Sequence, residues 1–168
     1  MKSKHSPSPG GSIAEDSSAL CLERQLCFAL YAASNQVTRL ARPMLDQLGL
    51  TYPQYLVMLV LWQHTSCTVG EIGSRLMLDS GTLTPLLKRM QGNGLITRTR
   101  DMPDERCVRI ALSAQGRALK HRAGDVPGQM RCRIALPDAS LESLREQLHG
   151  LLSAIQPTVD VPGAKPRA

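Results

Sequence analysis

Two copies of one helix-start pattern constrain the fold of this chain more than any other feature of its sequence. Thr51 is followed three residues later by Gln54, and Thr68 is followed three residues later by Glu71. In this pattern, the capping box, each of the two side chains bonds a backbone amide that has no partner inside the helix. The sequence therefore predicts that a helix begins at each threonine.

The segment between the two patterns is predicted to be a buried helix. Its run YLVMLVLW, from Tyr55 to Trp62, is apolar on every side, whereas a surface helix keeps one polar face. The helix predicted from Thr68 is short and ends near Met77. Both helices are therefore expected at the centre of a small helical domain.

A third helix is predicted from a cap at Asp79 or Ser80 to about Gln91. Beyond it the periodicity changes, because residues 95–100 alternate apolar or Thr residues with basic ones. This alternation predicts a strand, and residues 107–112 predict the returning strand after a turn at 101–105. The third helix has one apolar side, formed by Leu83, Leu86, Leu87 and Met90.

Long amphipathic helices are expected at both ends of the folded part. The first is predicted over about residues 20–48. Two more follow the hairpin, over about 114–134, with a kink near Pro127 and Gly128, and over about 140–155. The first and last helices carry more apolar surface than a small winged unit covers, so a second copy of the chain is expected to bury it.

This order of elements predicts a mainly α fold with a small β-hairpin wing, the winged helix-turn-helix. The fold is expected to form a two-fold homodimer through its N- and C-terminal helices. The folded domain is predicted over residues 18–155. Residues 1–17 are rich in Ser, Pro and Gly and are expected to be disordered, and residues 156–168 are expected to form a flexible tail.

Composition narrows the function classes. Only 3% of the residues are aromatic, so the core is built from aliphatic side chains, a composition that favours helices. The net charge of +6 suits a polyanionic partner. No apolar run approaches the roughly 18 residues that a membrane helix needs, and no secretory signal is found. A cytoplasmic protein with no membrane partner is therefore expected.

The five cysteines are expected to be thiols, because a reducing compartment disfavours disulfides. No two form a Cys-x-x-Cys pair, and neither a metal nor a cofactor is expected. On a continuous first helix Arg24 and Glu23 would both lie about one turn before Cys27, and their effects on its thiolate would nearly cancel. A cysteine in an apolar helix is also commonly a small core residue. Local charge therefore does not identify a reactive cysteine.

The third helix and the hairpin carry the side chains expected to contact DNA. Small hydroxyl residues and a glycine at the helix start suit base edges and phosphates, and the cations one turn later suit phosphates. The basic hairpin suits the DNA backbone or the minor groove, with an aspartate orienting one arginine. A solvated helix face and a charged turn explain each element alone, but their adjacency favours DNA binding. The predicted DNA-binding residues are Ser80, Gly81, Thr82, Thr84, Lys88, Arg89, Arg98, Arg100, Asp104 and Arg106.

Three segments, LTYPQYLVMLVLW, TVGEIGSRLMLDSGTLTPLLKRM and DERCVRIALS, resemble the MarR family of bacterial regulators. More narrowly, residues 20–152 resemble its organic hydroperoxide resistance regulator (OhrR) branch. The resemblance implies a winged-helix dimer that binds double-stranded operator DNA. It also implies repression of a nearby peroxidase gene until an organic hydroperoxide, the inducer, oxidises the protein.

The same resemblance assigns roles to two cysteines and two tyrosines. QLCFALYAAS resembles the family segment with the peroxide-reactive cysteine, which matches Cys27. Cys132 matches the resolving cysteine of two-cysteine members, which closes a disulfide from the other subunit, whereas one-cysteine members use small thiols. Tyr52 matches a tyrosine that donates to the thiolate across the dimer interface. Tyr31 is a second candidate for stabilising the thiolate, although packing is its simpler role, and the family's other thiolate-binding tyrosine is replaced by Ala41.

These observations favour an oxidant-sensing transcriptional repressor that is not an enzyme. The sequence is also compatible with three other functions. The first is a regulator of the same family that a small aromatic acid releases from DNA. The second is a thiol peroxidase, although no acid or base is placed beside Cys27 to support turnover. The third is an architectural DNA-binding protein that does not respond to oxidant.

Overall fold

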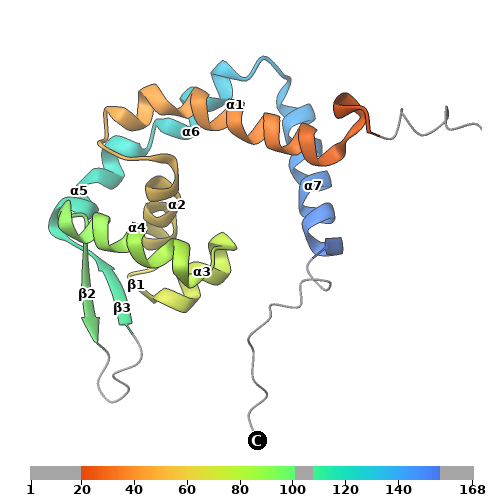
Figure 1. Cartoon of the computed structure of the whole chain (residues 1–168). Helices are drawn as coiled ribbons and strands as arrows, with labels where there is room; N and C mark the ends of the chain where they lie inside the picture. Colours follow the sequence, from red (N-terminus) through yellow and green to blue (C-terminus); the bar gives the residue numbers. More distant parts are fainter. Residues whose placement is uncertain (1–19, 101–107, 156–168) are drawn as a thin grey trace, which may run out of the picture. The chain divides into compact units, whose positions relative to one another are not determined.

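A computed structural model describes residues 20–100 and 108–155 of the 168-residue chain. They fold into two compact units, one ending at Val126 and the other beginning at Pro127 (Figure 1). The predicted tails at 1–17 and 156–168 and the hairpin turn at 101–105 lie outside the described residues. In the described part of the chain, no helix combines the length and apolar character needed to cross a membrane.

The structure confirms a mainly α chain with a small sheet. The first unit contains η1 (Leu22–Arg24), α1 (Leu26–Asp46), α2 (Tyr52–Gln63), β1 (Ser66–Thr68), α3 (Val69–Leu76), α4 (Ser80–Gly92), β2 (Ile96–Arg100), β3 (Val108–Leu112) and α5 (Ala114–Ala123). Helix α6 (Val126–Arg133) begins at the boundary between the units, and α7 (Asp138–Ile155) follows it.

Both predicted capping boxes are present. The Thr68 amide donates to the Glu71 carboxylate at 2.7 Å, and the Glu71 amide donates to the Thr68 hydroxyl at 3.2 Å. At α2 the Thr51 amide donates to Gln54 Oε1 at 2.9 Å. These bonds satisfy amides that lie before the first helical acceptors, so each helix begins where the sequence predicts.

Helix α2 lies in the core of the first unit, as its apolar run predicts. Val57 and Met58 are completely buried, and α2 contacts α1, α3, α4, α5 and β3. Leu83, Leu87 and Met90 form the buried side of α4. Helix α4 therefore packs by one face, and its opposite face remains available to solvent.

A three-stranded antiparallel sheet with order β1-β3-β2 completes the first unit. The predicted hairpin is confirmed, with Ile96 opposite Leu112 and Arg98 opposite Ile110, and it projects from the helices in Figure 1. Strand β1 was not predicted. It is only three residues long, too short to show alternation, and its last residue, Thr68, is also the cap of α3.

The prediction of one continuous helix over residues 20–48 is wrong at its start. The chain forms the short 3-10 helix η1, and Gln25 then adopts an extended conformation before α1 begins at Leu26. The Gln25 carbonyl accepts from the Ala29 amide at 3.1 Å, which makes Gln25 the cap of α1. Periodic apolar residues indicate a helical segment but do not show that the helix is continuous. Leu22 and Leu26 are both exposed, so packing against a core does not hold this segment in one helix.

The kink predicted near Pro127 and Gly128 is a break three residues earlier. Helix α5 ends at Ala123, and α6 begins at Val126. Proline inside a helix removes one backbone hydrogen bond, because it has no N–H, and its ring clashes with the preceding turn. In the first turn of a new helix it is tolerated. The chain therefore interrupts the helix before Pro127. The last helix also begins two residues before the predicted start, at Asp138.

Gly116 is predicted to be indispensable for the close approach of α5 to the backbone of Leu95, the residue before β2. A Cβ atom at this position would lie 2.1 Å from the Leu95 carbonyl oxygen, which belongs to the backbone and cannot rotate away. Gly116→Ala should therefore lower the free energy of unfolding by about 1–3 kcal/mol, the usual effect of overpacking. Gly92→Ala is the matched control, because no atom lies within 4 Å of its added Cβ. Urea denaturation that shows equal stability for the two variants would contradict this prediction.

Candidate nucleic-acid interface and reactive thiol

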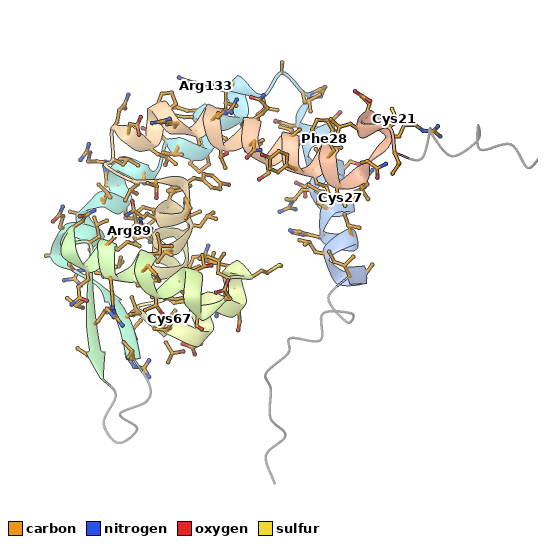
Figure 2. All side chains as sticks on the ribbon, viewed as in Figure 1. Cys21, Cys27, Phe28, Cys67, Arg89 and Arg133 are labelled. Atoms are coloured by element: carbon orange, nitrogen blue, oxygen red, sulfur yellow. The ribbon has the colours of Figure 1, made fainter. Side chains whose placement is uncertain are left out.

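The exposed face of α4 carries the first group of predicted DNA-binding residues. Ser80, Thr84 and Lys88 recur every four residues and therefore share one side of the helix. Ser80 and Lys88 are exposed, and Thr84 is half-buried between them. Arg89 is also exposed, next to Lys88 (Figure 2). The structure thus brings small hydroxyls and two cations together on a solvent-facing helix surface.

The first turn of α4 is held by Asp79, which settles the choice between Asp79 and Ser80 as the cap. Its carboxylate accepts from the Thr82 amide at 2.9 Å and from the Thr82 hydroxyl at 2.8 Å. Hydrogen bonds from Thr82, led by the one from its amide, lower the pKa of the Asp79 carboxyl. Because the Thr82 hydroxyl proton is engaged in the cap, Ser80 and Thr84 are better placed than Thr82 to donate to a ligand.

Of the four DNA-binding residues predicted on the wing, the structure describes the side-chain exposure only of Arg98. Arg98 lies half-buried on β2, between the exposed Thr97 and Thr99. Asp104 and Arg106 lie outside the described residues, and for Arg100 the structure describes only its place as the last residue of β2. The exposed Thr97 and Thr99 were not proposed from the sequence, although strand alternation places both of them on one face.

Cys27 is the second residue of α1 and is exposed to solvent (Figure 2). Arg24 and Glu23 do not lie one turn before Cys27 on the same helix, because the extended Gln25 separates them from α1. Glu23 instead accepts a hydrogen bond from the Cys21 thiol at 3.0 Å, and this bond lowers the pKa of the Glu23 carboxyl. The Cys27 side chain is therefore accessible to a small reactant, and the expectation of a packed core cysteine is not met.

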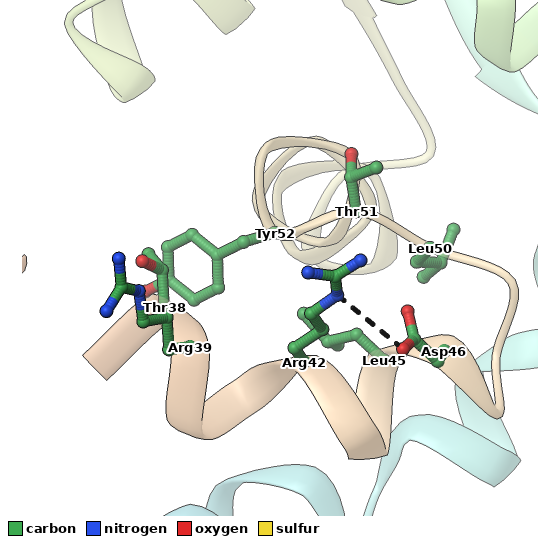
Figure 3. Close-up of a pocket in the computed structure, with 8 residues that line it drawn as sticks. All are labelled: Thr38, Arg39, Arg42, Leu45, Asp46, Leu50, Thr51 and Tyr52. Atoms are coloured by element: carbon green, nitrogen blue, oxygen red, sulfur yellow. Dashed lines mark ion pairs between the residues drawn. The ribbon is translucent and has the colours of Figure 1, made fainter. Parts of the chain in front are cut away.

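Tyr52 lies in a pocket of about 310 Å³ between α1 and the start of α2. Figure 3 shows its ring facing α1, with Thr38 and Arg39 on one side and Arg42 on the other. Arg42 pairs with Asp46 at 3.8 Å. The two arginines flank the buried Ala41 and were not proposed from the sequence, although their three-residue spacing on a helix places them on one side.

Cys27 does not line this pocket in the same chain. Thr38 is the first lining residue along α1, and a rise of 1.5 Å per residue places Cys27 about 16 Å before it along the helix. Tyr31 lies one turn after Cys27 and is 67% exposed, so it is not packed within one chain. One subunit therefore does not bring Cys27 and Tyr52 together.

The remaining cysteines differ in accessibility. Cys132 is exposed on α6 in the second unit, whereas Cys67 is buried in β1. Burial, the largest cause, raises the pKa of the Cys67 thiol and disfavours its reactive thiolate. Cys107 lies outside the described residues. Within the described residues, no cluster of three His, Cys, Asp or Glu side chains is arranged to hold a metal ion.

Comparisons with known proteins agree with this geometry. The family description "Transcriptional regulator SarA/Rot" matches residues 39–123. The chain is 48% identical over 134 residues to the organic hydroperoxide resistance transcriptional regulator of Bacillus subtilis (strain 168), covering 80% of this chain and 91% of that protein. Among solved structures, it is similar to reduced AbfR of Staphylococcus epidermidis bound to DNA, with a TM-score of 0.68, 34% identity, and coverage of 80% of this chain and 94% of that one. Disulfide-formed AbfR matches with a TM-score of 0.53 and 34% identity over 78% of this chain and 92% of that one.

The Asp79 cap should make part of the stability depend on acid pH. Because the pKa of Asp79 is lower in the folded chain than in the unfolded one, its stabilisation is complete above the unfolded value of about 4. It is lost as the pH falls through the lowered folded pKa. Asparagine caps a helix comparably but does not ionise. Asp79→Asn should therefore show a shallower fall in the free energy of unfolding below about pH 4, measured by urea denaturation, and identical slopes would refute this role.

Proposed function

Because the chain belongs to the SarA/Rot family of winged-helix transcriptional regulators, the MarR-type proteins, we propose that it is a dimeric, oxidant-sensing repressor. The observation that carries this proposal is the pairing of a polar α4 face with an exposed thiol at the start of α1. The proposed role is regulatory rather than catalytic, and binding to chromosomal DNA places it in the cytoplasm.

In this proposal α4 enters the major groove of operator DNA. Ser80 and Thr84 face base edges, while Lys88 and Arg89 neutralise phosphates. The hairpin reaches the neighbouring backbone or the minor groove with its arginines. The similarity to AbfR supports this arrangement, because the matched AbfR chain has a similar fold and is bound to DNA.

A two-fold dimer is supported by apolar side chains that one chain leaves exposed. Leu22 and Leu26 precede and begin α1, and both are more than half exposed. Helix α7 has no buried residue, and its Leu144 and Ile155 are nearly half exposed. A second copy that covers these faces would remove apolar surface from water at both ends of the chain.

The dimer also supplies a partner for Cys27. We place Cys27 of one subunit beside Tyr52 of the other, whose pocket in turn offers Arg39 and Arg42. A hydroxyl donor and nearby positive charge both favour a thiolate. Because Arg42 is paired with Asp46, Arg39 is the cation better placed to compensate for the hydroxyl that Ala41 lacks.

The chemical step is the oxidation of this thiolate by an organic hydroperoxide. The thiolate sulfur attacks the terminal peroxide oxygen, the O–O bond breaks, and the sulfenic acid forms; the alkoxide that leaves takes up the proton released when the thiol ionised and becomes an alcohol. The Cys132 thiol of the other subunit then attacks this sulfur, so that an S–S bond forms and water leaves. The B. subtilis relative, named for organic hydroperoxide resistance, and the disulfide form of AbfR support this sequence of steps.

The phosphate role of Lys88 predicts a salt-dependent loss of DNA affinity. Lys88→Gln should weaken binding to an operator duplex roughly 3- to 10-fold at low salt and reduce the slope of log K against log salt by about one. Arg122→Gln is the control. It removes one positive charge from α5, away from α4, and should leave the operator affinity and the salt slope unchanged. Fluorescence anisotropy on a duplex selected by the reduced protein provides the measurement. An unchanged salt slope in Lys88→Gln would exclude the contact.

The sensing role of Cys27 predicts that one substitution abolishes the response to peroxide. Cumene hydroperoxide should release the wild-type protein from the duplex, whereas Cys27→Ser should stay bound with its reduced-state affinity. Cys21→Ser is the control, because Cys21 is also partly accessible and should not alter release. Release of Cys27→Ser at the wild-type peroxide concentration would identify another sensor.

A further inference from the structure

Helix α1 consists of an anchored end and an arm that the core of the first unit does not hold. Its buried residues all lie near its C-terminus and are Ala41, Met44 and Leu45. Arg122 Nη2 donates to the carbonyl of Gln47, the residue after α1, at 2.7 Å, which ties this end of the helix to α5. No residue from 26 to 40 is buried within the chain. The arm, which carries Cys27, is therefore held to the core only through the anchored end.

The backbone of α1 is weakened where the arm meets the anchored end. Pro43 lies inside the helix and has no N–H, so the Arg39 carbonyl, four residues earlier, receives no helical bond from it. The Thr38 hydroxyl donates to the carbonyls three and four residues before it, both at 2.9 Å, and such bonds often bend helices. Prolines are also the commonest cause of helix kinks. Residues 39–43, called the Pro43 turn below, are therefore where α1 bends most easily.

The pocket around Tyr52 is built on this turn. Arg39 and Arg42 line it from the Pro43 turn, and Thr38 lines it from the residue before. Its other wall is the start of α2, with Thr51 and Tyr52 (Figure 3). Bending of α1 at the Pro43 turn would move these two walls relative to each other. A change in what occupies the pocket would, by the same coupling, change the angle of the arm.

Relatives of this fold are not fixed in one shape. The chain of reduced, DNA-bound AbfR matches this chain with a TM-score of 0.68, whereas the chain of disulfide-formed AbfR matches with 0.53, at 34% identity in both cases. The two AbfR chains therefore differ in shape from each other.

We propose that the Pro43 turn is the hinge that transmits oxidation of Cys27 to the DNA-binding elements, an inference that rests on the oxidant response proposed above. In the reduced dimer, Cys27 of the partner subunit occupies the Tyr52 pocket and fixes the angle of the arm. Once it is bonded to Cys132, Cys27 leaves the pocket, and the arm turns about Pro43 while the anchored end stays with α2 and α5. The arms belong to the proposed dimer interface, so this motion changes the spacing of the two α4 helices and weakens their hold on DNA.

Pro43→Ala tests the hinge, because alanine restores the backbone bond to the Arg39 carbonyl and stiffens α1. The reduced variant should bind the selected operator duplex with wild-type affinity, and its Tm should be higher than that of the wild type. Cumene hydroperoxide should form the Cys27–Cys132 bond to the wild-type extent, measured by intact mass spectrometry without reductant. The loss of operator affinity on oxidation, measured by fluorescence anisotropy, should nevertheless be at least about 5-fold smaller than in the wild type.

Pro127→Ala is the matched control. Pro127 lies in the first turn of α6, where an amide has no helical acceptor, so alanine restores no helical bond there and release should match the wild type. If the fully oxidised Pro43→Ala and wild-type proteins lose equal affinity, the hinge is overturned while the oxidant response stands. Failure of Pro43→Ala to form the disulfide would also overturn it, because the turn would then act on oxidation and not on transmission. Absence of peroxide release in the wild type would overturn the oxidant response and the hinge together.

Discussion

The burial of α2 is the interaction on which the rest of the first unit depends. This helix has no polar face to offer to water, and it contacts α1, α3, α4, α5 and β3. Removing each large apolar side chain from water contributes about 1.5–3 kcal/mol, so the burial of α2 helps to hold these neighbouring elements together, alongside the contacts that they make with one another. The orientation of α4 follows, because Leu83 and Leu87 face this core and Ser80 and Lys88 must then face solvent.

The same arrangement separates two kinds of chemistry. DNA contacts are proposed for the exposed side of α4 and the wing, which are supported by the α2 core. The thiol chemistry is proposed for the first turn of α1, where Cys27 and the nearby apolar residues Leu22 and Leu26 are exposed to solvent. In the proposed mechanism the signal from Cys27 reaches α4 through a second subunit, because Cys27 lies about three turns before the Tyr52 pocket along α1 of its own chain. Half-site spacing on DNA is fixed by the duplex, so a disulfide that changes the spacing of two α4 helices would weaken binding.

Features that depend on local bonding were predictable from the sequence. The capping boxes of Thr51 and Thr68 are local, and the structure confirms the helix starts that they predict. Strand β1 was not predictable, because its three residues gain their pairing from β3, more than 40 positions later. The break at Gln25 was missed for a related reason, since periodicity signals an apolar face and not the continuity of a helix. The pocket around Tyr52 needed the packing of α2 on α1, which no local pattern contains, so Arg39 and Arg42 were found only from the structure.

The central claim, a thiol switch that operates between subunits, is tested most directly by mixing two variants. Of the two proposed reacting thiols, Cys27→Ser retains the resolving one and Cys132→Ser retains the sensing one, and both variants keep the other three cysteines. After subunit exchange and treatment with cumene hydroperoxide, intact mass spectrometry without reductant should show a covalent heterodimer with a single Cys27–Cys132 bond. Neither variant alone should form this bond. Uncrosslinked subunits in the mixture, with Cys27 oxidised but not bonded to Cys132, would contradict the account.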